Sequence, residues 1–230
     1  MVEPEDELIL PETWRRRPWI PYLVIVAILA VVIGAGLAMN KALQPAASPQ
    51  LANCKTAAVL APHEYAARQP ICILPNKKYT ATLYTAAGQF DIQLHPENAP
   101  ETVNNFVVLA VNGYYNGLQF WDTQSWEVQG GDPNENGQGG PGYTLPDEPT
   151  PNLKWLPGAV GMARVPGGPI NGSQFFIVKT SWPNGNPNQT YNYFGTVVTG
   201  LDKVSALQPG DRINTITITV SNPTVVSGSR

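Results

Sequence analysis

Alternating apolar and polar residues dominate the second half of the chain and predict β-strands. The stretch KKYTATLYTAAGQFDIQL at residues 77–94 alternates on both sides of Gly88. This pattern predicts a β-hairpin with one buried face. Residues 212–220, RINTITITV, alternate in the same way and predict a closing strand.

Two segments between these strands change to helical spacing. In residues 99–115, Pro100 suits a first turn and Gly113 can end the helix, and apolar residues recur every three or four positions between them. Residues 200–210 predict a second, shorter helix that a Pro-Gly pair ends. We therefore expect a mainly β domain with two helices.

The longest apolar run lies near the N-terminus, where residues 18–40 contain no charged residue. At about 1.5 Å per residue, a helix over this run is about 34 Å long and can cross a hydrocarbon core of about 30 Å. Three arginines at 15–17 precede the run and only Lys41 follows it closely, which predicts a cytoplasmic N-terminus. A cleaved signal peptide is the alternative, although the run is longer than a typical signal-peptide core. We expect a single-pass membrane protein with an extracytoplasmic C-terminal domain.

These patterns divide the chain into five parts. We expect a cytoplasmic tail at 1–17, a transmembrane helix at 18–40, an extracytoplasmic linker at 41–77, a folded domain at 78–222 and a C-terminal tail at 223–230. The linker prediction rests on its Ala, Pro and Gln residues, which show no sustained period. Cys54 and Cys72 lie in this linker, and outside the cytosol we expect them to form a disulfide.

Composition excludes several classes of protein. The 230-residue chain has a formal net charge of -3, so it lacks the basic surface that is typical of nucleic-acid-binding proteins. Only 13% of its residues are charged, whereas it contains 23 prolines and 21 glycines, which favours a turn-rich β domain over a helical bundle. His63 and His95 form none of the tight spacings of zinc ligands with the two cysteines, so we expect no metal site.

Four motifs follow the predicted hairpin and first helix in an order that resembles a known family. They are QGGD at 129–132, NENGQGGPGY at 134–143, NGSQFFI at 171–177 and YFGTVVTGLDKV at 193–204. From Tyr79 to Val220 the chain resembles the cyclophilins, which are peptidyl-prolyl cis-trans isomerases, and the apolar run suggests a bacterial, membrane-anchored member. The resemblance implies a closed eight-stranded antiparallel β-barrel capped by two helices, with no cofactor and with proline-containing polypeptides as partners.

The resemblance also implies the residues of a proline-binding groove. Six residues match positions that line it: Trp126, Gln129, Ala163, Gln174, Phe176 and Tyr191. Trp126 and Phe176 would form an apolar slot for the pyrrolidine ring, together with a residue of segment 181–195. The other positions would face the substrate backbone or close the slot. For Phe176 a place in the barrel core is the alternative, because side chains alternate along a strand.

Two acidic residues depart from the family pattern. Asp122 stands where the family has the arginine that faces the proline nitrogen, and Glu127 replaces an apolar residue of the slot. An ionised carboxylate only accepts hydrogen bonds, so the loss of the arginine predicts weak turnover. Arg164 is our hypothesis for a substitute donor, held by Asp122 as a bidentate pair. A solvent-exposed ion pair, or no pair, is the alternative.

We therefore expect a peptidyl-prolyl isomerase that assists the folding of exported proteins. The alternative is a non-catalytic module that binds proline-containing peptides, or a structural subunit of a membrane complex. Asp122 favours the alternative, whereas the rest of the matched groove favours the enzyme.

Overall fold

The strands predicted at the two ends of the domain pair with each other in the computed structural model, which describes residues 49–55, 59–68, 70–183 and 190–223. The strands in chain order are β1 (Val59–Ala61), β2 (Glu64–Tyr65), β3 (Lys78–Thr85), β4 (Gly88–Leu94), β5 (Phe120–Thr123), β6 (Glu127–Gly130), β7 (Thr144–Leu145), β8 (Ala159–Arg164), β9 (Ile170–Val178), β10 (Asn192–Thr199) and β11 (Ile213–Ser221). The helices are the 3-10 helix η1 (Pro49–Cys54) and the α-helices α3 (Pro100–Val111) and α4 (Leu201–Ala206). The predicted hairpin is β3 and β4, the predicted closing strand is β11, and both predicted helices are present.

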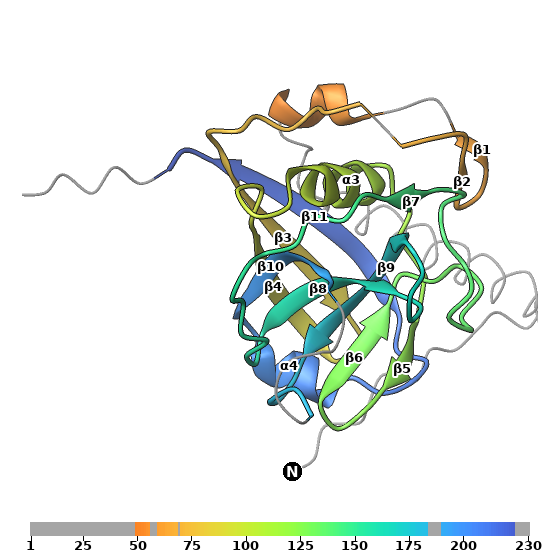
Figure 1. The fold of residues 1–230 in the computed structure, drawn as a ribbon. Coiled ribbons are helices and arrows are strands. Elements are labelled where there is room, and N and C mark those ends of the chain that lie inside the picture. The colour runs from red at the N-terminus through yellow and green to blue at the C-terminus, as the bar shows by residue number, and fades with distance from the viewer. Residues whose placement is uncertain (1–48, 56–58, 69, 184–189, 224–230) are drawn as a thin grey trace, which may run out of the picture. The chain divides into compact units, whose positions relative to one another are not determined.

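The main sheet is antiparallel and strongly curled (Figure 1). Its strands follow the order β11-β3-β4-β10-β8-β9-β6-β5, and β7 pairs with β9. The prediction of a closed barrel is wrong for the described strands, because the edge strands β11 and β5 form no ladder. The segments at 117–120 and 210–213 are joined by backbone hydrogen bonds and by an isolated bridge between Gln119 and Arg212. The reason is length: β5 has 4 residues and β11 has 9, so most of β11 has only β3 as a neighbour.

Helix α3 lies over one end of the curled sheet and α4 lies near the other (Figure 1). Pro100 occupies the first turn of α3, where its missing N–H costs no hydrogen bond. Gly113, at φ +75°, ends the helix, and the N–H of the next residue, Tyr114, donates to the carbonyl of Leu109 at 2.9 Å. The glycine predicted to stop this helix therefore does so through a left-handed turn.

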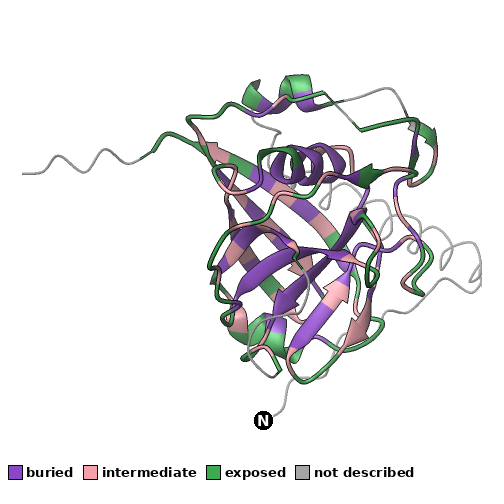
Figure 2. Ribbon diagram, viewed as in Figure 1, coloured by how far each residue is buried: buried purple, intermediate pink, exposed green. Residues whose placement is uncertain are grey.

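The described residues between 49 and 77 pack on α3 and do not form the free linker that their composition predicts. Leu51, Tyr65 and Ile73 from this segment belong to the buried core of the domain. The structure joins Cys54 to Cys72 in a disulfide. We call these residues the N-terminal segment; Figure 2 shows it outside the buried residues of α3.

Asn104 of α3 ties the N-terminal segment to the helix. Its side-chain oxygen accepts hydrogen bonds from the N–H groups of Cys72 at 2.8 Å and Ile73 at 3.3 Å. Its side-chain nitrogen donates to the carbonyl of Pro70 at 3.1 Å. Asn104 is buried, so these bonds satisfy polar groups that water does not reach. A buried asparagine on an otherwise apolar helix thus has a structural role.

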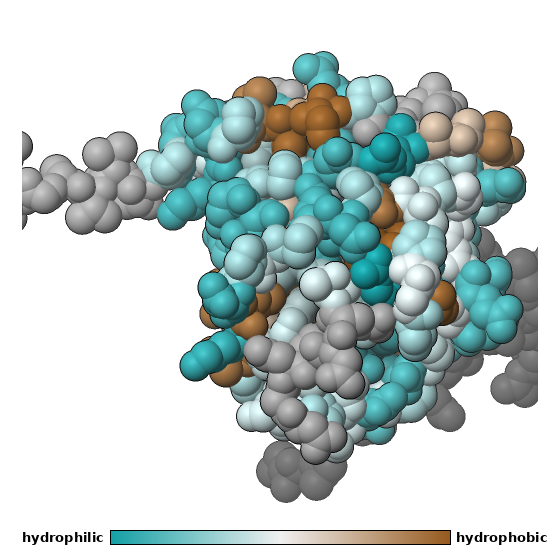
Figure 3. All heavy atoms as spheres, in the orientation of Figure 1, coloured by the Kyte–Doolittle hydropathy of each residue, from teal (hydrophilic) through white to brown (hydrophobic). Residues whose placement is uncertain are grey.

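On the face shown in Figure 3, apolar residues occur in small separate groups among hydrophilic ones. Most of the large apolar side chains of the domain are therefore inside it. Within the described ranges, no helix has the length and apolar character that crossing a bilayer requires. The predicted transmembrane helix at 18–40 and the predicted tail at 1–17 lie outside those ranges, and so does all but the first residue of the predicted tail at 223–230.

Candidate active site

An aromatic cluster covers the face of the sheet opposite the main core. Along β9 the side chains alternate: Phe175 and Ile177 belong to the main core, whereas Phe176 and Val178 belong to a second apolar cluster. Phe176 therefore lies outside the main core, and it is buried within this second cluster. Three aromatic side chains contact Phe176: Trp155, Trp182 and Tyr191. Trp126 contacts Trp182 and Tyr193 contacts Trp155, which extends the cluster.

The spacing of the rings defines this aromatic cluster. The ring of Phe176 lies 5.1 Å from that of Tyr191 and 5.7 Å from that of Trp182, between centroids. Trp126 contacts Trp182 at 4.4 Å. Trp155 packs beneath Phe176 at 5.1 Å and is buried. Trp126, Tyr191 and Trp182 are only half-buried, so the cluster presents aromatic surface to solvent.

Gly161 makes room for the cluster. It pairs with Phe176 across β8 and β9, and a Cβ at Gly161 would lie 2.4 Å from the end of the Phe176 ring and 2.6 Å from Trp155. Any side chain at this position would displace one of the two rings. The glycine here therefore serves close packing.

Strand register places polar residues in one row with Phe176. Asp122 of β5 is opposite Gln129 of β6, Gln129 is opposite Phe176, and Phe176 is opposite Gly161. Directly opposite residues of an antiparallel pair point to the same face, so Asp122 and Gln129 lie on the face of the aromatic cluster. Glu127 is opposite Val178 and lies on this face too.

Two glutamines form a hydrogen-bonded pair beside Phe176. Gln129 Nε2 donates to Gln174 Oε1 at 2.8 Å, and Gln174 Nε2 donates to the carbonyl of Gly139 at 2.7 Å. Asn171 also donates to that carbonyl, at 2.9 Å. The carbonyl of Gly139 thus fixes the orientation of the Gln174 amide directly and that of the Gln129 amide through Gln174. The structure brings the six residues of the expected groove to one face, and their roles in binding stay predictions.

Asp122 has no basic partner among the described residues. Its carboxylate accepts a hydrogen bond from Gln124 Nε2 at 3.2 Å, and Gln124 Oε1 accepts one from the indole of Trp126 at 3.0 Å. Asp122 therefore helps to orient Trp126. Among the described residues, no arginine forms an ion pair with Asp122.

The predicted pair between Arg164 and Asp122 is wrong. Arg164 forms an ion pair with Asp147 at 2.6 Å and donates to the carbonyl of Thr190 at 3.2 Å. Arg164 ends β8, which lies on the far side of β9 from β5 and β6 in the sheet order. Its guanidinium thus binds Asp147 and Thr190, the residue before Tyr191. The hypothesis of Arg164 as a substitute donor has no support in this geometry.

Glu127 carries the perturbed carboxyl of the site. The residue is 8% exposed, and the pKa of its carboxyl is raised to about 7, mainly by burial. The nearby Asp122 carboxylate contributes to this rise, and the Lys179 ammonium opposes it. The sequence shows Glu127 as a departure from the family, but only the packing shows that the side chain is buried.

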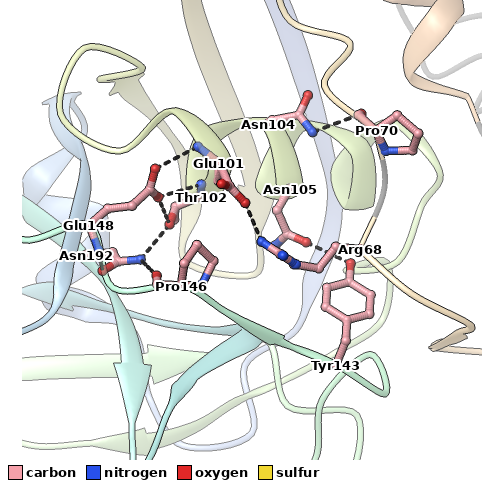
Figure 4. A network of polar contacts seen from close by, with 10 residues as sticks. All are labelled: Arg68, Pro70, Glu101, Thr102, Asn104, Asn105, Tyr143, Pro146, Glu148 and Asn192. Atoms are coloured by element: carbon pink, nitrogen blue, oxygen red, sulfur yellow. Dashed lines mark hydrogen bonds and ion pairs between the residues drawn. The ribbon is translucent and has the colours of Figure 1, made fainter.

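A polar network behind the cluster fixes the start of β10, which follows Tyr191 (Figure 4). Asn192 donates from Nδ2 to Thr102 Oγ1 and to the carbonyl of Pro146, both at 2.8 Å. The Glu148 carboxylate accepts hydrogen bonds from the backbone N–H groups of Glu101 and Thr102, each at 2.9 Å. The N-cap residue of α3, Ala99, has no side chain that can accept hydrogen bonds from the first turn. The Glu148 carboxylate takes that role, and its negative charge is favourable at a helix N-terminus.

The sequence analysis did not identify three residues of the aromatic cluster. Trp182 lies in the segment 181–195 from which one slot residue was expected, without being singled out. Trp155 and Tyr193 were not predicted, although Tyr193 begins the motif at 193–204. No group of three or more His, Cys, Asp or Glu in the described ranges is placed to hold a metal ion.

Comparison with known proteins gives concordant matches. Residues 80–226 match the family described as cyclophilin type peptidyl-prolyl cis-trans isomerase/CLD. The chain is 39% identical over 140 residues to the Arabidopsis thaliana protein named peptidyl-prolyl cis-trans isomerase CYP65, a match that covers 58% of this chain and 23% of the plant protein. It is 40% identical over 126 residues to peptidyl-prolyl cis-trans isomerase B of Bacillus subtilis, covering 54% of this chain and 86% of that protein.

Solved structures agree with these matches. A crystal structure of a cyclophilin type peptidyl-prolyl cis-trans isomerase from Cryptosporidium parvum has a TM-score of 0.56 and 30% sequence identity. The similarity covers 64% of this chain and 99% of that one. The match to the plant protein, by contrast, spans less than a quarter of that protein's length.

Proposed function

Because the chain belongs to the cyclophilin type peptidyl-prolyl cis-trans isomerase family, we propose that it catalyses cis-trans isomerisation of X-Pro bonds in polypeptides. This reaction crosses a barrier of about 18–20 kcal/mol, because the amide loses its resonance when it twists. A catalyst must therefore bind the twisted amide more tightly than either planar form. The observation that carries the proposal is the aromatic cluster and the glutamine pair on one face of the sheet.

The residues of this face suit the two parts of an X-Pro segment. The half-buried rings of Trp126 and Trp182 offer apolar surface for the pyrrolidine ring, and the buried ring of Phe176 packs against Trp182. An amide side chain has two N–H donors and one oxygen acceptor, and Gln129 uses one N–H on Gln174. The oxygen and the second N–H of Gln129 remain for the substrate backbone. No covalent intermediate and no cofactor take part in this proposal.

Exchange between cis and trans forms of a short X-Pro peptide tests the proposal. We expect added protein to broaden the exchanging proton resonances or to increase exchange cross-peaks. Trp182→Ala should lower kcat/KM by at least about tenfold, because it removes a half-buried ring from the cluster without opening the main core. Val198→Ala, an exposed position on the same sheet outside the cluster, serves as control. No gain in exchange at any pH would refute the proposal.

Asp122 favours a second candidate function, a non-catalytic module that binds proline-containing peptides. Loss of one preorganised donor typically lowers a rate by about 10² to 10³-fold. Peptide binding without increased exchange in the same experiment would support this second function. Asp122→Arg should then create catalysed exchange, because the introduced guanidinium is a donor at the position where the family carries one.

We also propose that a helix at 18–40 anchors the domain outside the cytosol, where it assists the folding of exported proteins. The uncharged run and the arginines before it support this proposal, and so does the disulfide, since disulfides persist in oxidising compartments. In spheroplasts, externally added protease should degrade the domain, and the intact protein should sediment with membranes. Protection from protease, together with free thiols at Cys54 and Cys72, would contradict the proposal.

A further inference from the structure

The site lacks a hydrogen-bond donor at the position where the family carries one. Asp122 stands there, and its carboxylate accepts a hydrogen bond from Gln124. Arg164 is held by Asp147 and by the carbonyl of Thr190. Any donor to the proline nitrogen must therefore come from another residue on the face of the aromatic cluster.

Glu127 is on that face and next to the vacated position. It lies opposite Val178, a member of the apolar cluster that contains Phe176, and it directly follows Trp126 in the chain. Asp122 and Gln129 form the neighbouring cross-strand pair of β5 and β6. Glu127 is thus close to both the apolar surface for the ring and the position of the lost arginine.

The Glu127 carboxyl is also poorly solvated. The residue is more than nine-tenths buried, and among the described residues its carboxyl has no hydrogen-bond partner. A buried carboxylate without partners is costly, whereas a neutral carboxylic acid is tolerated and has an O–H to donate. This group therefore has an unused donor when it is protonated.

We propose that Glu127, in its neutral form, donates a hydrogen bond to the substrate proline nitrogen and so replaces the arginine of the family. The inference rests on the proposed isomerase function. As the amide twists, the nitrogen lone pair becomes localised and accepts this hydrogen bond, which is weaker in either planar state. The proton stays on Glu127 throughout, so no bond is broken and no co-reactant is needed.

The charges around Glu127 favour the neutral form near neutral pH. The pKa of its carboxyl is raised to about 7, mainly by burial and in part by the carboxylate of Asp122 on β5. The ammonium of Lys179, which follows β9, opposes this effect. No other charged group in the described part of the chain shifts this pKa. Asp122, which removes the usual donor, thereby helps to keep a substitute donor protonated.

The pH dependence of kcat/KM for a short X-Pro peptide without titratable side chains tests the inference, with the full chain in detergent. Between pH 5.5 and 9 we expect a plateau at low pH and a fall of about tenfold per unit above the midpoint, because the ionised carboxylate cannot donate. The uncatalysed isomerisation of such a peptide does not depend on pH, so a fall in rate must come from the enzyme. A rate that is high and flat over this range would overturn the inference and leave the isomerase function intact.

Four variants separate a donor from a structural residue. Glu127→Gln keeps an N–H donor and should give a rate that no longer depends on pH. Glu127→Met, which restores the apolar character of the family at this position, should lower the plateau by about 10²-fold. Asp122→Asn removes the like charge and should move the midpoint to lower pH, whereas Lys179→Met should move it to higher pH.

The outcomes of these measurements are distinct. Equal plateau rates for wild type and Glu127→Met would overturn the donor role. Midpoints that do not move in Asp122→Asn and Lys179→Met would assign the titration to another group and would also overturn it. Absence of catalysis in the wild type at every pH would instead refute the proposed function on which the inference rests.

Discussion

Asp132→Ala is expected to lower the free energy of unfolding by about 3–5 kcal/mol. Asp132 is fully buried, and its carboxylate accepts hydrogen bonds from the backbone N–H groups of Asn134 at 2.8 Å, Asn136 at 3.0 Å and Gly137 at 2.5 Å. Alanine would leave all three donors without their acceptor, and each unsatisfied donor costs about 1–3 kcal/mol when water cannot replace it. Urea unfolding followed by tryptophan fluorescence measures the loss.

The same variant should also weaken catalysed exchange. The loop that Asp132 organises contains Gly139, whose carbonyl holds the side chain of Gln174. Asn134→Ala is the matched control, because it removes an exposed side chain from the same loop and leaves its backbone N–H in place. We expect this control to change the stability by less than about 0.5 kcal/mol. A loss below about 1 kcal/mol for Asp132→Ala would contradict the structural role of the carboxylate.

Removal of the disulfide by Cys54→Ser with Cys72→Ser is expected to cost about 3 kcal/mol of stability. The two cysteines are 18 residues apart in the sequence, and the entropic model gives about this value for a loop of that size. In the entropic model the loss comes from the greater conformational freedom of the unfolded chain once the crosslink is removed. The crosslink lies in the N-terminal segment, whose Leu51, Tyr65 and Ile73 belong to the buried core. Urea unfolding of wild type with and without a reductant should show the same difference.

Two comparisons make the disulfide prediction specific. The double serine variant should not respond to the reductant, because it has no disulfide to lose. Asn53→Ser, at an exposed neighbour of Cys54, should respond as the wild type does. Equal unfolding free energies for oxidised and reduced wild type would show that the disulfide adds nothing to the stability of the domain.

The elements of the fold with strong local patterns were predictable. Strands β3, β4 and β11 alternate between apolar and polar residues, and α3 has proline in its first turn and glycine just past its end. Closure of the sheet was not predictable, because it depends on how many residues of β5 find partners on β11. The packing of the N-terminal segment was missed because single apolar residues such as Leu51 and Ile73 form no periodic pattern.

The sequence was enough to predict several residues of the candidate site, but not the ion pairs that they form. Phe176, Gln129 and Gln174 stand in motifs that are specific to the family, and the structure brings them to one face. The partner of Arg164 was mispredicted, because Asp147 and Asp122 are equally plausible in the sequence. Only the folded structure shows that Asp147 is within reach of Arg164, whereas the sheet order separates Arg164 from Asp122 of β5.

The amino-acid order alone was enough to indicate the family and the order of several strands and helices along the chain, and it predicts that Asp122 stands in place of the family arginine. These depend on local periodicity and on motifs, which are read along the chain without knowledge of its path in space. The burial of Glu127, the pairing of Arg164 with Asp147 and the docking of residues 49–77 on α3 came only from the folded arrangement. Desolvation and ion pairing depend on which distant segments surround a group, and the chain acquires those surroundings only when it folds.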